Sequence, residues 1–323
     1  MLPLVAALLL LAADPDPAKA LEDRITRSVA AAERGVAAVV VSHRDYKDGL
    51  PTVDKPWLLG DYQPQGIVAP GGRFFPQPTA GSRLNLADPS AAADNTFGSG
   101  LVLAADGRVL TAYHLIEGAT KIYVRTPGGG GSYANLHAAD ARSDLAVLKL
   151  IDPPPNLQPV RLADVRTVRG PRGEPATVRK GQFVIALGHP LAAGAVDGGP
   201  SASWGVLSNL RRRLVGPGTG DTNRNRPLAS YAVLLQTDAR VTLGCSGGGL
   251  FNLDGEAIGL TSSTAGVTGA DTAGGYAVPF DHNVRRAVDA LLAGREVEYG
   301  FLGVTMGTGF GFPPPGCGRT TGW

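Results

Sequence analysis

From residue 97 onward, apolar positions fall in short runs that turn-forming residues separate. Runs of this kind, rich in Val, Leu and Ile and bounded by Gly, Asp or Asn, are typical of β-strands. The predicted strands are 100–104, 108–112, 121–125, 144–151, 182–187, 203–207, 232–237, 249–252, 257–262 and 275–278. Asp106-Gly107 and Asp254-Gly255 each separate two apolar runs, which indicates hairpins. So many short strands predict an all-β protein, built as a barrel or a sandwich.

Helical spacing of apolar residues occurs in two segments, one before residue 97 and one after the last predicted strand. Leu21, Ile25 and Val29 predict a helix over 21–34, before a β-branched run at 36–42, and the spacing within 280–292 predicts a late helix. Residues 44–95 are rich in Pro, Gly, Asp and Ala without periodicity, which predicts a long surface loop. Residues 128–131 form a glycine run without the Lys-Ser/Thr of a phosphate loop, so a flexible turn is expected there.

The first twenty residues have the pattern of an export signal. Leu2 to Ala13 is almost wholly apolar, and Ala18-Lys19-Ala20 resembles a signal-peptidase site. Twelve apolar residues are too few to span a bilayer, which needs about 20. We therefore predict a cleaved signal over 1–20 and no stable membrane insertion after cleavage, with a retained anchor or a misplaced start as the alternatives.

Composition narrows the class of protein further. The apolar fraction of 43% and the charged fraction of 18% suit a globular chain, and the net charge of +2 is too small for a nucleic-acid binder. Cys245 and Cys317 are the two cysteines and form no disulfide framework, so the core must hold the fold.

The sharpest chemical motif is the run Gly244-Cys245-Ser246-Gly247-Gly248. Glycines around a serine allow a tight turn and close approach of a substrate, as a nucleophile requires. The same run fits the nucleophile elbow of α/β-hydrolases, but a strand rather than a helix follows it, and His282, the one downstream histidine, begins a predicted helix. Cys245 as the nucleophile is disfavoured because the glycines centre on Ser246.

Two partners for this serine lie upstream. His114 ends an apolar strand and Asp144 begins another, so the order along the chain is His, Asp, Ser, as in trypsin-like enzymes. Singly, each residue fits an ordinary structural role; together they predict a catalytic triad. The other histidines (His43, His137, His189 and His282) lack metal-ligand spacing, and surface or loop roles are expected for them.

Over residues 97–304 the sequence resembles the HtrA (Deg) family of trypsin-like serine proteases. The stretches that carry the resemblance are Gly98-Ser-Gly-Leu-Val-Leu, Thr111-Ala-Tyr-His-Leu-Ile, Ser143-Asp-Leu-Ala-Val-Leu-Lys, Val184-Ile-Ala-Leu-Gly-His-Pro, Gln236-Thr-Asp-Ala, Gly244-Cys-Ser-Gly-Gly, Leu253-Asp-Gly-Glu-Ala-Ile-Gly and Gly275-Tyr-Ala-Val-Pro.

The resemblance implies two perpendicular β-barrels with the active site between them, His114 and Asp144 on the first and Ser246 on the second. It implies an oxyanion hole from the N–H groups of Gly244 and Ser246, and no metal or organic cofactor. It further implies protein or peptide substrates and a homotrimer. The predicted export signal indicates a periplasmic or secreted location.

Some positions depart from the family or bear on specificity. Arg240 lies six residues before Ser246, where enzymes selective for basic side chains carry an acid. We hypothesise that Arg240 lines the S1 pocket and favours an acidic or polar P1 residue; the alternative is that it points to solvent beside a small apolar pocket near Val241. Thr261 is also expected to line S1.

The predicted organisation is a signal peptide at 1–20, a helix and first strand at 21–43, a long flexible loop at 44–95, the protease domain at 96–299, and a tail at 300–323. Loop 44–95 falls where relatives carry a regulatory loop, which favours a role in covering the active site or in assembly; the alternative is an inert, mobile insertion. The tail opens with Gly300-Phe-Leu-Gly-Val, the usual start of a PDZ domain, but 19 residues after Val304 are too few to complete one.

These features predict a serine endopeptidase that cleaves unfolded or exposed protein segments, in envelope protein quality control. The alternative is a catalytically silent peptide-binding or chaperone-like module on the same fold.

Overall fold

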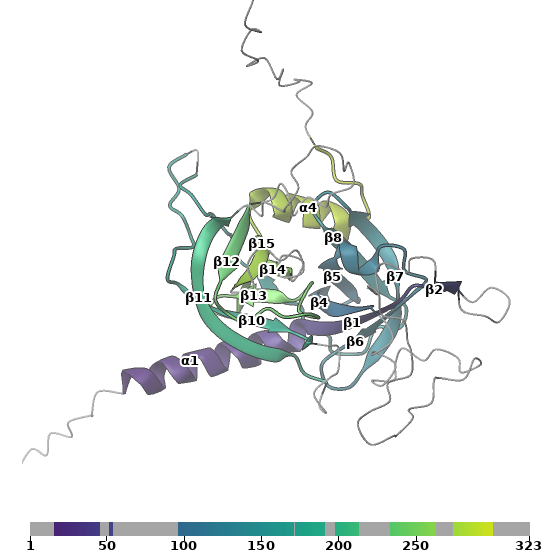
Figure 1. Cartoon of the computed structure of the whole chain (residues 1–323), viewed down its shortest axis with the longest axis horizontal. Coiled ribbons are helices and arrows are strands. Elements are labelled where there is room, and N and C mark those ends of the chain that lie inside the picture. The colour runs from purple at the N-terminus through teal and green to yellow at the C-terminus, as the bar shows by residue number, and fades with distance from the viewer. Residues whose placement is uncertain are drawn as a thin grey trace, which may run out of the picture.

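Antiparallel β-barrels make up most of the computed structural model, which describes residues 16–45, 52–53, 96–170, 172–190, 198–212, 233–262 and 274–299 (Figure 1). The first barrel closes in the order β1-β4-β5-β8-β7-β6. Its strands are β1 (Val36–Ser42), β4 (Thr96–Ala104), β5 (Arg108–Ala112), β6 (Lys121–Arg125), β7 (Gly131–Asp140) and β8 (Leu145–Leu150).

The second barrel follows the order β13-β10-β11-β12-β15-β14 and closes through pairing of β13 with β14. Its strands are β10 (Phe183–Gly188), β11 (Ser201–Arg212), β12 (Leu234–Thr237), β13 (Gly249–Phe251), β14 (Glu256–Ser262) and β15 (Gly275–Pro279). The short β9 (Arg161–Leu162) pairs in parallel with β14. The all-β architecture of two barrels is therefore confirmed.

Two apolar clusters hold these barrels. One fills the first barrel, where Val39, Val41, Val102, Val109 and Leu148 are fully buried. The other fills the second barrel and reaches residues of the first, including Leu101 and Leu110. The β-branched run of β1 is buried along its whole length, because both of its faces meet apolar neighbours. The contact between the barrels is thus part of the core.

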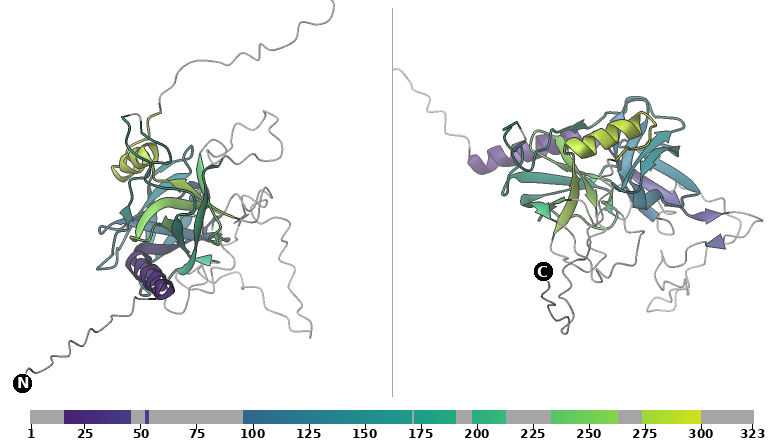
Figure 2. Two further views of the ribbon diagram at one scale, coloured as in Figure 1. Left: turned by 90° about the vertical axis from the view of Figure 1, so that its left-hand side faces the viewer. Right: turned by 90° about the horizontal axis from the view of Figure 1, so that it is seen from above.

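The two longer helices lie on opposite sides of the sheets (Figure 2). Helix α4 (His282–Leu292) packs on β7 and β8, and Asp281 caps it by accepting from the N–H groups of Asn283 and Val284, both at 3.0 Å. Helix α1 (Pro17–Ala32) begins four residues before the predicted start because Asp16 caps it and Pro17 suits the first turn. A one-turn 3₁₀ segment, η1 (Glu33–Gly35), joins α1 to β1.

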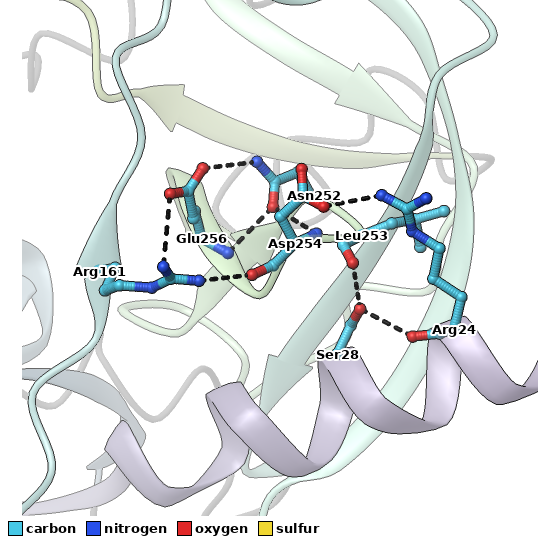
Figure 3. Close-up of polar contacts among 7 residues, drawn as sticks. All are labelled: Arg24, Ser28, Arg161, Asn252, Leu253, Asp254 and Glu256. Carbon is cyan, nitrogen blue, oxygen red and sulfur yellow. Dashed lines mark hydrogen bonds and ion pairs between the residues drawn. The ribbon is translucent and has the colours of Figure 1, made fainter.

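Polar contacts hold α1 against the β13–β14 hairpin (Figure 3). Arg24 forms an ion pair with Asp254 at 2.7 Å, and the buried Ser28 hydroxyl donates to the carbonyl of Leu253. Asn252 Oδ1 accepts from the N–H groups of Asp254 and Glu256, which shapes the predicted Asp254-Gly255 turn. The helix is thereby fixed to the barrel that carries Ser246.

Several local predictions need correction. Strand β7 was not predicted, since the apolar residues of Gly131–Asp140 are mostly alanine; pairing with β6 and β8 supplies its stability. His114, predicted to end a strand, lies instead in the short helix α2 (Tyr113–Ile116), which begins directly after β5.

The long segment 44–95 lies mostly outside the described residues. Within it, β2 (Arg44–Asp45) pairs with β3 (Thr52–Val53). Residues 1–15 of the predicted signal and the tail 300–323 also lie outside, while Ala18-Lys19-Ala20 is in the first turns of α1. Among the described helices, none combines the length and apolar character needed to cross a membrane.

Candidate active site

The predicted histidine and aspartate are in direct contact. Asp144 Oδ2 lies 2.7 Å from His114 Nδ1, and Asp144 Oδ1 accepts the backbone N–H of His114 at 2.8 Å. The carbonyl of Asp144 accepts the N–H of Tyr113 at 3.1 Å. Asp144 thus caps α2 from 30 residues away and fixes both the backbone and the ring of His114.

Burial makes this contact strong. The Asp144 side chain is 5% exposed and the His114 side chain 26%. A carboxylate withdrawn from water is screened little, so its hydrogen bond to an imidazole is strengthened. With Nδ1 held by the carboxylate, Nε2 is the ring nitrogen left for proton exchange.

A second carboxylate shapes the loop that presents Asp144. Asp140 accepts from the N–H groups of Arg142 at 3.3 Å and Ser143 at 3.1 Å, and Asp144 follows with a left-handed backbone, φ 55°. The Tyr299 hydroxyl donates to Asp140, and the Arg142 guanidinium lies 4.3 Å from the centre of the Tyr299 ring. Burial, with the hydrogen bond to Asp140, raises the pKa of Tyr299 to about 12, so the phenol stays a donor. Sequence reasoning missed this contact, which joins residues 159 positions apart.

The predicted nucleophile lies in a tight turn between β12 and β13. Cys245 N–H donates to Thr242, Gly248 N–H to Cys245 and Gly247 N–H to Thr261, at 3.0, 2.9 and 2.9 Å. These three amides serve the turn itself. The oxyanion hole predicted from the amides of Gly244 and Ser246 is compatible with this arrangement and stays a prediction.

Gly98 marks where the histidine helix meets the serine turn. A Cβ atom there would lie 3.0 Å from the Ser246 carbonyl oxygen and 3.1 Å from Cδ2 of Leu115, the residue after His114. Only glycine allows this close approach. The structure therefore brings the segments bearing His114 and Ser246 against the same glycine.

Of the surface or loop roles predicted for His189, the loop role holds, because His189 follows the end of β10, but the surface role is wrong, because His189 is only 3% exposed. Its backbone N–H donates to Ser99 Oγ at 2.8 Å, and its Nε2 lies 3.3 Å from the Val36 carbonyl oxygen. Burial lowers the pKa of His189, the nearby Arg125 lowers it further, and the bond to Val36 partly offsets both. The apolar run 184–187 just before it was the available signal for burial.

This shift predicts a pH dependence of stability. Below the ordinary histidine pKa of about 6.5, the unfolded chain binds a proton that folded His189 does not, so the free energy of unfolding falls as pH falls through that window. Above about pH 6.5 both states are neutral and the effect ends. We expect urea unfolding of the wild type to lose more stability between pH 7.5 and 5.5 than that of His189→Gln. Equal losses in the two proteins would contradict it.

The predicted S1 residues are placed differently from one another. Arg240 is exposed, and its carbonyl accepts from Ser203 Oγ at 2.8 Å. Val241 is half-buried, and its Cγ2 would lie 2.5 Å from a Cβ atom at Gly275. Thr261 is buried with its hydroxyl donating to the carbonyl of Cys245 at 2.5 Å. Thr261 therefore supports the serine turn.

Comparison with known proteins identifies the family. The family model described as trypsin-like peptidase domain matches residues 98–260. Serine endoprotease DegS of Haemophilus influenzae is 32% identical over 214 residues, which cover 65% of this chain and 54% of the relative. A probable periplasmic serine endoprotease, DegP-like, of Pseudomonas fulva is 32% identical over 259 residues, or 80% of this chain and 44% of the relative.

Solved structures show the same fold. The HtrA-type protease AlgW, solved with a tripeptide, superposes with a TM-score of 0.52 at 22% identity, covering 84% of this chain and 64% of that one. The chain spans about half the length of the curated relatives it matches. By family model, relatives and fold, the chain belongs to the trypsin-like peptidases and to their HtrA/Deg group.

Proposed function

We propose that the protein is a serine endopeptidase that cleaves unfolded or exposed protein segments through Ser246, His114 and Asp144. The observation that carries the proposal is the double hydrogen bond of Asp144 to the ring and backbone of His114, at 2.7 and 2.8 Å. Holding Nδ1 in this way leaves Nε2 unprotonated in the neutral imidazole, as a general base requires.

The reaction follows from these roles. Ser246 Oγ attacks the scissile carbonyl while His114 Nε2 takes the hydroxyl proton, and Asp144 stabilises the imidazolium. The N–H groups of Gly244 and Ser246 bind the developing oxyanion. His114 then protonates the leaving amine, which gives the acyl-enzyme, and a water activated by the same imidazole hydrolyses the ester. Apart from the substrate and the hydrolytic water, each step uses only side chains and backbone groups of the chain.

The S1 residues favour a small apolar pocket over a basic one. Arg240 is exposed, whereas Val241 is half-buried beside Gly275. We therefore propose that Val241 limits the pocket and that Arg240 points to solvent. P1 profiling tests this, since unchanged preference in Arg240→Ala fits it and a changed preference contradicts it.

The names of the relatives support a periplasmic location for this activity. The relative from Pseudomonas fulva is called periplasmic, and so is a DegP-like relative from Marinomonas. Together with the apolar run at 2–13, this supports export and a role in envelope protein quality control. A homotrimer is part of the proposal, and sedimentation analysis of the purified protein would measure it.

One observation favours a second function, a catalytically silent peptide-binding or chaperone-like module. Ser246 is only 1% exposed, so a substrate must reach a nearly covered nucleophile. A serine that no substrate reaches would leave peptide binding as the function.

Fluorophosphonate labelling with casein hydrolysis tests the proposal. The wild type should label at Ser246 and degrade unfolded casein, and Ser246→Ala should do neither. Ser132→Ala is the matched control, because Ser132 is also a buried serine but lies on β7. Casein binding without labelling or cleavage would overturn the peptidase and support the silent module.

A further inference from the structure

Ser99 on β4 of the first barrel is bonded through each of its polar atoms, and it is fully buried. Its N–H donates to the Ser246 carbonyl and its hydroxyl donates to the Gly244 carbonyl, both at 2.7 Å. The same hydroxyl accepts the N–H of His189 at 2.8 Å. Its carbonyl accepts from the Thr111 hydroxyl on β5 at 2.7 Å. One residue of the first barrel therefore holds two segments of the second.

The two carbonyls that Ser99 holds belong to Gly244 and Ser246, whose amides form the proposed oxyanion hole. A carbonyl shares a rigid peptide plane with the N–H of the next residue, so these two bonds directly fix the peptide groups 244–245 and 246–247. The N–H of Ser246 belongs to the peptide group between those two, and the N–H of Gly244 to the peptide group just before them, so both are restrained through the shared Cα atoms. An oxyanion hole depends on such fixed orientation, because donors that must reorient stabilise the transition state less.

We propose that Ser99 is a positioning residue of the oxyanion hole, and that its hydroxyl holds the 244–245 peptide group, which adjoins the peptide groups of both proposed donors, in place against the first barrel. This inference rests on the proposed peptidase activity. Ser99 touches no reacting atom; it acts through Gly244 and Ser246. The hydroxyl ties His189 to the same point, so the end of β10 and the serine turn are held together.

The test compares substrate turnover with the binding of a transition-state analogue. Removing an oxyanion donor lowers kcat by about 10²–10³-fold, and loss of a residue that only orients the donors should lower it by about 10- to 100-fold. We therefore expect Ser99→Ala to lose kcat with little change in KM. The Ki of a peptide boronic acid should rise by the same factor as kcat/KM falls, because both depend on the hole.

Ser132→Ala is the matched control for folding and stability. The Ser132 hydroxyl is also buried, accepts an N–H (Asp152, 2.9 Å) and donates to a carbonyl (Tyr133, 2.8 Å), but lies on β7 away from the serine turn. If Ser99→Ala does not fold, Ser99→Cys under reducing conditions replaces it, because its thiol keeps the shape and is a weak donor. The same rise in Ki is expected.

The outcomes separate this inference from the proposed function. An active wild type with Ser99→Ala matching Ser132→Ala in kcat and Ki overturns the role of Ser99 alone. A loss confined to KM overturns it as well. A wild type that neither hydrolyses peptides nor binds the boronic acid overturns the peptidase itself, and this inference with it.

Discussion

Asp144→Asn is expected to lower kcat by about 10⁴-fold while the protein stays folded. The reason is the proton on the imidazole. Asp144 uses one oxygen for the His114 backbone N–H and the other for Nδ1. Asparagine has a single acceptor oxygen, so when that oxygen keeps the backbone bond, its NH₂ group faces Nδ1 as a donor. Nδ1 must then accept, the proton moves to Nε2, and His114 no longer accepts a proton from Ser246.

Two measurements check this result. Steady-state kinetics on a quenched peptide give kcat, and ¹⁵N NMR of the His114 ring reports which nitrogen carries the proton. Asp106→Asn is the control, because it removes a carboxylate from the first barrel at the β4–β5 turn, where Asp106 pairs with Arg108 and Lys149. We expect near-wild-type kcat for it. An Asp144→Asn protein with the Nδ1 proton retained and kcat within tenfold of wild type would refute the assigned role.

The predictions for His114 and Asp144 show which features of the site the sequence can predict and which it cannot. Both residues were predicted as partners of Ser246 from their order and flanking motifs. The predicted local structure of His114 was wrong, however, because His114 lies in α2 and not at a strand end. Four residues are too few for a helix to form from propensity alone. The carboxylate and carbonyl of Asp144 hold this turn. Because Asp144 lies 30 residues from His114, no local sequence pattern indicates the contact.

The strands were predicted where an apolar pattern marks them and missed where it does not. Those with apolar runs, such as β5 and β14, were predicted nearly to their ends, because burial of one or both faces leaves a pattern in the sequence. Strand β7 carries mostly small and polar side chains and forms through backbone pairing on both edges. Backbone hydrogen bonds leave no mark on residue type, so such strands escape prediction.

Ser99 was visible in the sequence only as part of Gly98-Ser-Gly. Its contacts run to His189 and Gly244, 90 and 145 positions away. The closure of two barrels against each other brings these residues together, and no spacing rule encodes that. The sequence therefore predicted the candidate reacting residues, of which the structure shows His114 and Asp144 in contact, while the residues that hold them in place needed the structure.

The second large effect is expected for Gly247→Ala in the serine turn. Gly247 has φ 82°, a conformation that costs other residues about 1–2 kcal/mol. A Cβ atom there would lie closer than 3.0 Å to the Ser99 carbonyl oxygen and 2.6 Å from Thr111 Oγ1. Relieving such a clash in a packed core costs about 1–3 kcal/mol more, and shifting the turn by about 1 Å costs about 10²-fold in rate. We expect both stability and kcat to fall.

Gly129→Ala separates the two causes. Gly129 has nearly the same φ, 84°, but a Cβ atom there would meet nothing within 4 Å. It should therefore show only the backbone cost of about 1–2 kcal/mol in urea unfolding, with full kcat. The difference between the two variants measures the clash with the first barrel. Equal destabilisation with unchanged kcat in both variants would mean that the serine turn shifts freely. The inference that Ser99 holds the turn rigidly, and so orients the Gly244 and Ser246 amides, would then have to be abandoned.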